Sequence, residues 1–405
     1  GHLLLPRDGS RDSKRLEQED HDLLPRTHEI ILAYTLYTLH HTPYTMQHII
    51  DQFQLENPVL LPEAIKVGII NESYRLKAAT EGGKSYFLQR INHNIFQDVE
   101  GLQRNIERVT SHIRQLLIEA DETDIERKVL RVVPTKDGKL YYKTPAGDYW
   151  RVYVLIENAL SYEQITPEGA YLAGKAYGEF QCQLASLDAE TLVESIPNFH
   201  NLEFRIQQLH EALEKDAAGR KAETKDIADY LLKRAEAMCI AETLYREGKL
   251  PKRINHCDTK INNMLFNAEG NPMCIVDLDT VMPGFVLSDF GDFIRTAANT
   301  GAEDDRNLDN IHVNMDIFQA YTKGYLSTAT FLTPLEISLL PYGCKRMSFM
   351  QAVRFYIDYL NGDTYYKIAY PDHNLVRTKA QIRLFQEQEA VEEQMKECIH
   401  NGLTE

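Results

Sequence analysis

The segment from His256 to Asp279, HCDTKINNMLFNAEGNPMCIVDLD, constrains the fold of this chain more than any other stretch of its sequence. Its two short apolar runs, MLF and MCIV, are separated by NAEGNP, in which Gly, Pro and Asn favour a turn over a continued strand. This pattern predicts a β-hairpin in which Met264 pairs with Val276 and Asn263 pairs with Asp277. The last two side chains are therefore expected side by side at the open end of the hairpin.

The polar side chains at this end suit phosphoryl transfer. Asn263 and Asp277 offer an amide oxygen and a carboxylate oxygen, which are ligands that Mg²⁺ accepts while waters and substrate phosphates fill its other positions. Asp258 lies on the polar loop that leads into the hairpin. There its carboxylate can accept the proton of a hydroxyl group that attacks a phosphate.

The order H-x-D-x-x-x-x-N, made by His256, Asp258 and Asn263 and followed by an apolar strand that ends in Asp277, resembles the catalytic and metal loops of the aminoglycoside phosphotransferase and choline kinase group. These enzymes are relatives of the protein kinases. The resemblance implies that Asp258 is the catalytic base, that Asn263 and Asp277 bind Mg²⁺, and that His256 is structural. It also implies an α+β, bilobed, protein-kinase-like fold with a small sheet-containing N-terminal lobe and a larger, mainly helical C-terminal lobe.

A second motif lies just downstream, where Asp289, Phe290 and Gly291 spell the metal motif of protein kinases. No strand precedes it, so we expect SDFGDFIR to begin a helix, with Ser288 as its N-cap. Asp289 and Asp292 are then expected to support the catalytic loop from behind.

Composition excludes several classes of partner. The 60 acidic and 44 basic side chains give a formal charge of −16, which argues against a nucleic acid or an anionic membrane as partner. No run approaches the roughly 20 apolar residues that span a bilayer. The six cysteines form no C-x-x-C pair, so we expect free thiols and a cytoplasmic location.

The chain is expected to divide into three parts. Residues 1–45 are charged and predict a mobile leader. Residues 46–156 contain mostly alternating strand patterns and predict a nucleotide-binding lobe. From 157 the pattern becomes helical, so residues 157–405 predict the catalytic and substrate lobe, and residues 157–159 the linker between the lobes.

The nucleotide site is expected in the first lobe. The resemblance implies that a strand pair covers the nucleotide, which points to Gly68, Asn71 and Ser73, and that the next strand carries a cation to the phosphates, which points to Arg90. This sequence departs from the protein kinases, because the cover has a single glycine and the cation is arginine. A guanidinium nevertheless chelates phosphate well. Glu157, in the linker, is expected where an adenine meets backbone groups.

A helix is expected after this strand. Asn94 and Gln97 fit a capping box. The apolar residues that follow recur at steps of three and four, as on one face of a helix: Val99, Leu102, Ile106, Val109, Ile113 and Leu116. In the resembling kinases such a helix supplies a glutamate that fixes the phosphate cation, and here both Glu100 and Glu107 are candidates.

The stretch RFYIDYLNGDTYYKI, residues 354–368, combines aromatic, acidic and basic groups as a sugar pocket requires. Together with FLQRINHNIFQDVEGLQRNI, HCDTKINNMLF and VDLDTVMPG, it resembles the N-acetylhexosamine 1-kinases, which use ATP and Mg²⁺ to phosphorylate the anomeric hydroxyl of N-acetylglucosamine or N-acetylgalactosamine. The resemblance implies ATP and a small sugar as partners. We expect Arg354, Asp363 and Tyr365 to contact the sugar.

Other functions stay open. MCIVDLDTV also fits the D-x-D-x-T loop of haloacid-dehalogenase phosphatases, with Asp277 as nucleophile and Asp279 as acid, although this leaves the residues from His256 to Asn263 unexplained. A ligand-binding module without catalysis is a further alternative. Among kinases, choline, homoserine and aminoglycosides are alternative acceptors, because a fold does not fix its substrate.

Overall fold

The computed structural model describes residues 46–65 and 70–403. Residues 53–405 form one compact unit, and residues 46–52 belong to a separate one. The expected leader, residues 1–45, lies outside the described residues.

Six strands form an antiparallel sheet in the first lobe, in the order β1-β2-β3-β6-β4, with β5 also paired to β6. Tight turns with glycines at positive φ connect some of these strands, at Gly82, Gly138 and Gly147. The register places Ser73 beside Gln89, and Gln89 beside Arg151, in one row across the sheet. The strands are β1 (Glu63–Ile65), β2 (Glu72–Leu76), β3 (Tyr86–Ile91), β4 (Val132–Val133), β5 (Tyr142–Lys143) and β6 (Tyr149–Val154).

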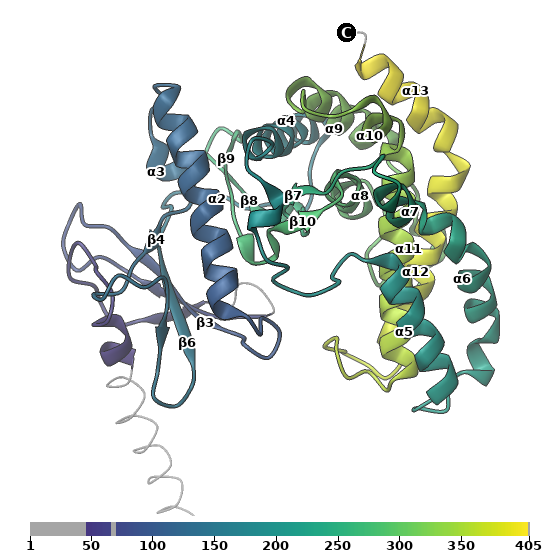
Figure 1. Ribbon diagram of the computed structural model, residues 1–405, viewed down its shortest axis with the longest axis horizontal. Coiled ribbons are helices and arrows are strands. Elements are labelled where there is room, and N and C mark those ends of the chain that lie inside the picture. The colour runs from purple at the N-terminus through teal and green to yellow at the C-terminus, as the bar shows by residue number, and fades with distance from the viewer. Residues whose placement is uncertain (1–45, 66–69, 404–405) are drawn as a thin grey trace, which may run out of the picture. The chain divides into compact units, whose positions relative to one another are not determined.

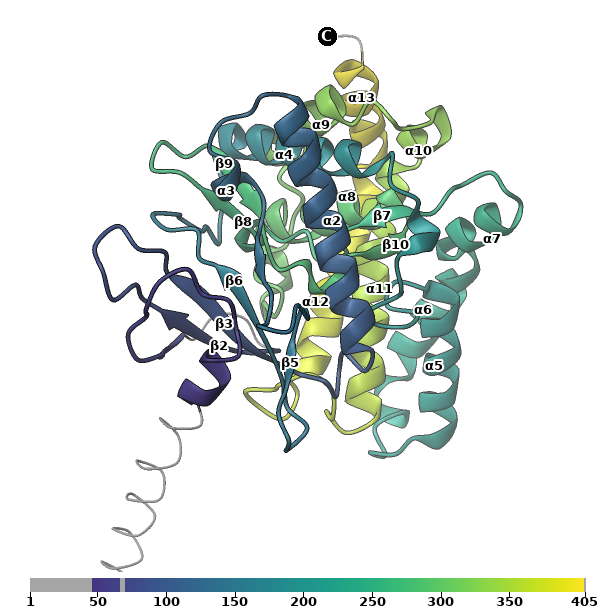
Figure 2. The same ribbon diagram turned by 60° about the vertical axis from the view of Figure 1, so that its left-hand side comes forward.

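Helix α2 (Val99–Glu119) lies between this sheet and the helical lobe (Figures 1 and 2). The expected apolar stripe is buried from Val99 to Ile113 and joins a core that also contains Phe180 and Leu278 of the second lobe. The expected capping box is wrong, because Asn94 lies in a preceding turn. The N-cap is Asp98, whose carboxylate accepts a hydrogen bond from the backbone N–H of Gly101 at 2.8 Å.

Helices dominate the rest of the chain. The α-helices after α2 are α3 (Ile125–Lys128), α4 (Pro167–Leu184), α5 (Leu202–Lys215), α6 (Lys225–Met238), α7 (Ile240–Arg246), α8 (Val286–Ala297), α9 (Met315–Thr328), α10 (Pro334–Ser338), α11 (Leu340–Leu360), α12 (His373–Ala390) and α13 (Glu392–Gly402). The 3₁₀ helices are η1 (Ala189–Thr191), η2 (Ala222–Thr224), η3 (Ile261–Asn263), η4 (Leu278–Thr280) and η5 (Leu308–Asn310). Among the described residues, no helix is long and apolar enough to cross a membrane.

Helices α4 and α9 pack unusually closely, backbone against backbone. A β-carbon on Gly174 would lie 2.2 Å from the carbonyl oxygen of Tyr321, and one on Gly324 would lie 2.0 Å from that of Tyr171. Side chains at these two positions would force the helices apart. The two glycines therefore fix helix α4, which packs behind the catalytic loop.

Two small antiparallel ribbons carry the candidate site. Strand β7 (Arg253–Asn255) pairs with β10 (Met282–Gly284), and β8 (Met264–Phe266) pairs with β9 (Pro272–Ile275). The catalytic loop runs from β7 to η3, directly before β8. The lobes are thus a sheet-containing first lobe and a mainly helical second lobe, as the sequence predicts.

Candidate active site

His256 anchors the catalytic loop and is completely buried. Its Nε2 donates to the carbonyl oxygen of Val276 at 2.8 Å, and its Nδ1 accepts the backbone N–H of Asp258 at 3.3 Å. The ring thus joins the loop to the residue that follows strand β9. Asp258, two residues later, keeps 28% of its side chain exposed. This matches the structural role expected for His256.

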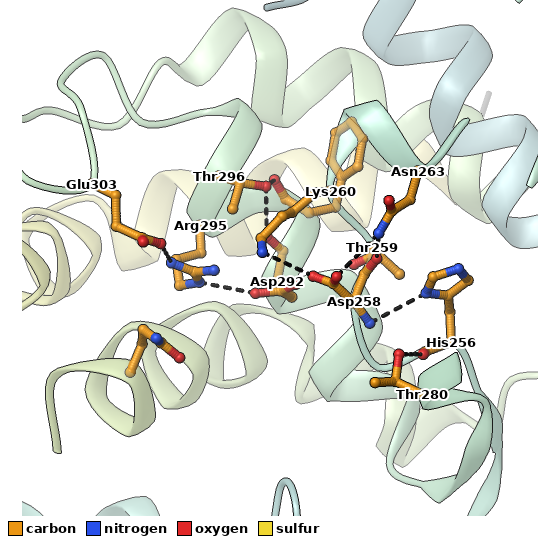
Figure 3. A network of polar contacts seen from close by, with 12 residues as sticks. His256, Asp258, Thr259, Lys260, Asn263, Thr280, Asp292, Arg295, Thr296 and Glu303 are labelled. Atoms are coloured by element: carbon orange, nitrogen blue, oxygen red, sulfur yellow. Dashed lines mark hydrogen bonds and ion pairs between the residues drawn. The ribbon is translucent and has the colours of Figure 1, made fainter. Parts of the chain in front are cut away.

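Asn263 lies against Asp258. Its Nδ2 donates to the backbone carbonyl of Asp258 at 2.8 Å and to its Oδ2 at 3.1 Å. Figure 3 shows this contact, and Asn263 is the last residue of η3. Because the amide nitrogen is engaged with Asp258, the side-chain oxygen is the atom of Asn263 that remains for a cation.

The hairpin forms, but the predicted register is wrong. Met264 pairs with Ile275, and a bulge interrupts the ladder after Leu265. The turn is closed by the backbone N–H of Asn267 on the carbonyl of Asn271, at 2.9 Å, so it is centred one residue earlier than expected. Asn263 therefore lies opposite Val276, and Asp277 follows as the next residue.

Asp277 ends the hairpin in a left-handed conformation, with φ of 58° and ψ of 56°. This conformation turns the chain sharply into η4. Burial raises the pKa of Asp277, and the negative charges of Asp279 and Asp258 raise it further. Asp277 is therefore a buried carboxyl group among like charges, which is an environment that a divalent cation would neutralise.

Lys260 is a site residue that the sequence reasoning did not single out. Its Nζ lies 3.2 Å from Oδ1 of Asp258 (Figure 3), and this charge is the main cause that raises the pKa of Lys260. Behind it, Arg295 donates to Asp292 at 2.9 Å and to Glu303 at 2.7 Å. Lysine two residues after the aspartate was visible in the sequence, but nothing local indicated which carboxylate it would contact.

Asp289 supports the catalytic loop from helix α8, as expected. Its carboxylate accepts the backbone N–H groups of His256 and Cys257 at 2.7 and 2.8 Å, and its carbonyl oxygen accepts the Thr259 hydroxyl. The expected N-cap Ser288 is wrong, because the helix begins at Val286. The Asp289 carboxylate is thus engaged by the backbone of the catalytic loop, which argues against a role as a metal ligand.

A second unpredicted feature joins the two lobes. Arg151 of strand β6 forms a two-pronged ion pair with Asp279, at 2.5 and 2.9 Å, and both side chains are almost fully buried. Asn71, an expected nucleotide contact, donates to the same carboxylate at 2.7 Å. Asp279 is therefore engaged by two donors of the first lobe, which leaves it poorly suited to act as the acid of a phosphatase.

The other expected nucleotide residues lie in different settings. Ser73 is buried and accepts a hydrogen bond from Gln89 at 3.0 Å. Glu157 accepts the hydroxyl of Ser85 at 2.6 Å, just after strand β6. Gly68 lies outside the described residues. Ser73 and Gln89 belong to the row across the sheet that ends at the cross-lobe ion pair, so this row faces the second lobe.

Arg90 does not have the partners expected for it. It pairs with Glu72 at 2.9 Å and with Asp148 at 2.6 Å, on the neighbouring strand and turn. The prediction that Glu100 or Glu107 of helix α2 holds Arg90 is therefore wrong. Glu100 is exposed, and Glu107 accepts a hydrogen bond from its own helix. Strand alternation explains the difference, because Arg90 and the inward-facing Gln89 lie on opposite faces of the sheet.

Asp363, an expected sugar contact, takes part in an internal network. It adopts a left-handed conformation and accepts hydrogen bonds from Arg220 at 2.6 Å and Asn374 at 2.9 Å. Nearby Asp358 accepts the backbone N–H groups of residues 364–366. These bonds hold the loop after helix α11 in a fixed shape.

The other two expected sugar contacts reach the surface of this loop. Tyr365 is 59% exposed and packs edge-on against Tyr366. The Arg354 guanidinium lies 4.9 Å from the ring centre of Phe199 and 5.6 Å from that of Tyr366. Arg354 and Tyr365 are thus brought to one aromatic surface.

Comparisons with known proteins agree with this architecture. Residues 63–326 match the model of a family described as the phosphotransferase enzyme family, APH. Amicoumacin kinase hAmiN, solved with AMP-PNP, Ca²⁺ and Ami, is 13% identical with a TM-score of 0.56, over 89% of this chain and 96% of that one. Plasmodium vivax ethanolamine kinase is 15% identical with a TM-score of 0.51, over 93% and 99%.

A microcompartment-associated aminopropanol kinase is also similar, at 14% identity and a TM-score of 0.51, over 87% of this chain and 98% of that one. At such identities the likeness shows the fold. The predicted α+β, bilobed, kinase-like fold is therefore confirmed.

Proposed function

This chain belongs to the phosphotransferase enzyme family, and from that premise we propose that it is an ATP- and Mg²⁺-dependent kinase for an N-acetylhexosamine. The transfer would go to the anomeric hydroxyl and give the sugar 1-phosphate. The observation that carries the kinase assignment is the meeting of Asp258, Asn263 and Asp277 at the end of one hairpin. The narrower sugar assignment rests on the resemblance of the four sequence stretches.

Asp258 is proposed as the general base. The acceptor oxygen would form a bond to the terminal phosphorus of ATP as the bond to the ADP oxygen breaks, and the hydroxyl proton would pass to the Asp258 carboxylate. Its two oxygens contact Asn263 and Lys260, so the carboxylate is held in one orientation. The anomeric hydroxyl is more acidic than other sugar hydroxyls and therefore needs less from its base.

The donor set fits Mg²⁺. Asn263 and Asp277 supply two oxygen atoms, and no group of three or more His, Cys, Asp or Glu side chains that could hold a metal occurs in the described residues. Few protein ligands are typical of Mg²⁺ sites, since phosphates and waters complete the shell. When bound, Mg²⁺ would neutralise charge on the transferring phosphoryl group. The AMP-PNP and Ca²⁺ of the hAmiN structure support a nucleotide and a divalent cation in this family.

The nucleotide and sugar contacts remain proposals. Gly68, Asn71, Ser73, Arg90 and Glu157 are proposed to line the nucleotide site. Arg90 has two carboxylate partners and lies on the face of the sheet opposite to Gln89, so among these residues it has the least support from its surroundings.

Arg354, Asp363 and Tyr365 are proposed at the sugar site. In this proposal Arg354 and Tyr365 would contact the sugar directly, whereas Asp363 would act by holding its loop in shape.

A substrate panel tests the proposal. ATP consumption should be measured with N-acetylglucosamine, N-acetylgalactosamine, choline, homoserine and an aminoglycoside, beside the Asp258→Asn variant as a blank. The product from a hexosamine should show phosphorus splitting of the sugar H1 signal in coupled NMR spectra. Splitting at H6, or turnover of choline or an aminoglycoside without that of a hexosamine, would overturn the sugar 1-kinase assignment. Acid-stable phosphate on the enzyme would contradict direct transfer.

A further inference from the structure

Three arginines of the helical lobe differ from their neighbours in lacking an acidic partner. Arg253 pairs with Glu336, and Arg346 pairs with Glu242. In the described part of the chain, by contrast, no carboxylate forms an ion pair with Arg205, Arg354 or Arg377. We call these three residues the arginine cluster.

The hydrogen-bond acceptors of the arginine cluster are all neutral. Arg205 donates to the carbonyl oxygen of Phe199 at 3.0 Å and to the Gln208 side chain at 2.8 Å. Arg354 donates to the Gln351 side chain at 3.0 Å. Arg377 donates to the Asn374 side chain at 3.1 Å and to the Lys367 carbonyl at 3.3 Å. Neutral acceptors leave three positive charges uncompensated.

Two of the three cations face one aromatic group, and the third, Arg205, bonds to the backbone of Phe199 in that group. The Arg354 guanidinium faces the rings of Phe199 and Tyr366, and the Arg377 guanidinium lies 5.4 Å from the ring centre of Phe355. The rings of Phe355 and Tyr366 are 4.8 Å apart. The residues come from the turn before helix α5, from helices α5, α11 and α12, and from the loop between the last two. Helix α11 packs against both α5 and α12 (Figure 1).

The electrostatics agree with this geometry. Burial and the nearby Arg354 charge together lower the pKa of Arg205 to about 10. Burial also lowers the pKa of His200, and Arg354 is again the next contributor. Like charges therefore lie close together in partly buried positions, which an anion would stabilise.

One member of the arginine cluster, Arg377, acts electrostatically on Glu303 of the catalytic network. Although desolvation opposes it, the pKa of Glu303 is held below its usual value by Arg295, and Lys260 and Arg377 add to this effect. Arg377 and the lysine beside Asp258 thus act on the same carboxylate. In our proposal the cluster would hold one part of an acceptor while the hydroxyl group of that acceptor reaches Asp258.

We propose that the arginine cluster binds a carboxylate or phosphate group of the acceptor, so that the preferred substrate is an anionic N-acetylhexosamine. This inference rests on the proposed kinase function and narrows its substrate. The aromatic rings would pack on the sugar ring, and the planar guanidinium groups would bind the anion with two hydrogen bonds each.

Matched acceptors test the inference. The kcat/KM should be compared for N-acetylglucosamine, its 6-phosphate, its C6 carboxylate and its 3-O-carboxymethyl ether. Charge-assisted hydrogen bonds contribute about 1.5–3 kcal/mol, so at least one anionic acceptor should exceed the neutral sugar by roughly 10- to 100-fold. Arg205→Gln should remove this advantage and leave the neutral sugar nearly unchanged. Arg354→Gln, which also alters a proposed sugar contact, should lower kcat/KM for the anionic acceptors by a larger factor than for the neutral sugar. Arg246→Gln is the control, because Arg246 lies on helix α7 and is paired with Glu203 of helix α5.

Two outcomes separate this inference from the kinase assignment. The anion site would be overturned, and the kinase assignment would stand, if the neutral sugar reacts at least as fast as every anionic form. An equal loss of kcat/KM for all acceptors in the arginine variants would have the same meaning. If no acceptor is phosphorylated, thermal stabilisation by the same four sugars gives a second readout. Stabilisation by an anionic form that depends on Arg205 would support the site without the kinase, and equal shifts for all four would overturn it.

Discussion

Arg151 of the first lobe and Asp279 of the catalytic lobe form a buried ion pair with two parallel contacts, at 2.5 and 2.9 Å. Gln89 accepts two further hydrogen bonds from Arg151, and Asn71 donates to Asp279. The donors and acceptors of both charged groups are therefore well matched, which is the condition under which a buried ion pair is tolerated. The pair fixes η4, and with it the position of Asp277 two residues before.

Removal of either charge should destabilise the protein. Arg151→Met or Asp279→Asn leaves an unpaired or half-satisfied polar group in the interior, which costs about 3–5 kcal/mol in comparable cases. Equilibrium unfolding in urea would measure the loss. Arg246→Met is the control, because its pair with Glu203 is exposed and should matter little. An equal loss of unfolding free energy in Arg151→Met and Arg246→Met would contradict a special role for the buried pair.

Asp258→Asn should abolish turnover while ATP still binds. General-base catalysis contributes roughly 10² to 10⁴ in rate, whereas the nucleotide is proposed to bind elsewhere. Steady-state kinetics and nucleotide titration measure the two effects separately. Asp229→Asn is the control, since Asp229 is exposed on helix α6. More than a tenth of the wild-type kcat in Asp258→Asn would remove this residue from the role, and a phosphatase would tolerate the change.

Asn263→Ala and Asp277→Asn should each raise the Mg²⁺ concentration needed for half-maximal rate. Asn263→Ala removes one oxygen ligand, and Asp277→Asn replaces a charged carboxylate with a neutral amide oxygen that binds Mg²⁺ more weakly, in a site with few protein ligands. Rates measured across a range of Mg²⁺ concentrations at saturating ATP would show the shift. Asn94→Ala, an exposed asparagine of the first lobe, should leave the curve unchanged. No shift in either site variant would mean that the cation binds elsewhere.

The Mg²⁺ requirement should depend on pH through Asp277. Burial, with Asp279 and Asp258, raises the pKa of Asp277 to about 7. Above this pKa the carboxylate is ionised and free to bind the cation; below it a proton competes, so the apparent Mg²⁺ affinity should fall as pH decreases from about 8 to about 6. Titration calorimetry in buffers of different ionisation enthalpy would detect the released proton. Asp277→Asn should abolish this release, and a wild-type protein that releases none would contradict the assignment.

Lys260→Gln should lower kcat more than it raises the KM for ATP. Lys260 contacts Asp258, so on the proposed mechanism its charge would stabilise the transferring phosphoryl group. The loss of one such group costs on the order of 10²-fold in rate. Lys225→Gln is the matched control, because Lys225 also pairs with an aspartate but is largely exposed. A kcat within twofold of wild type would make Lys260 a structural residue only.

Local patterns predicted much of the fold. The strands before residue 155, the apolar stripe of helix α2 and the hairpin after Asn263 follow from alternation, helical periodicity and turn residues, all of which act within a few positions. The hairpin register did not follow. It depends on a bulge at Leu265 and on the left-handed conformation of Asp277, and neither leaves a clear mark in the sequence.

The contacts between distant segments could not be read from the sequence either. Arg151 and Asp279 are 128 positions apart, and an arginine within an apolar strand was the only local indication that it needed a buried partner. For Arg90 the partners are local and the prediction looked too far away. The family resemblance suggested a glutamate on helix α2, whereas the neighbouring strand and turn supply Glu72 and Asp148.

The position of Asp289 affects how mutations in this site would be interpreted. Because its carboxylate accepts two backbone N–H groups of the catalytic loop, its replacement would misplace Asp258 without touching the cation. In a scan of all single substitutions, Asp289 would score as severely as Asp277, and its Asp-Phe-Gly context would invite the conclusion that it is a third metal ligand. Growth measured under limiting and excess magnesium would separate the two kinds of variant. Only variants of direct Mg²⁺ ligands should grow better as the ion becomes abundant, whereas Asp289 variants should not.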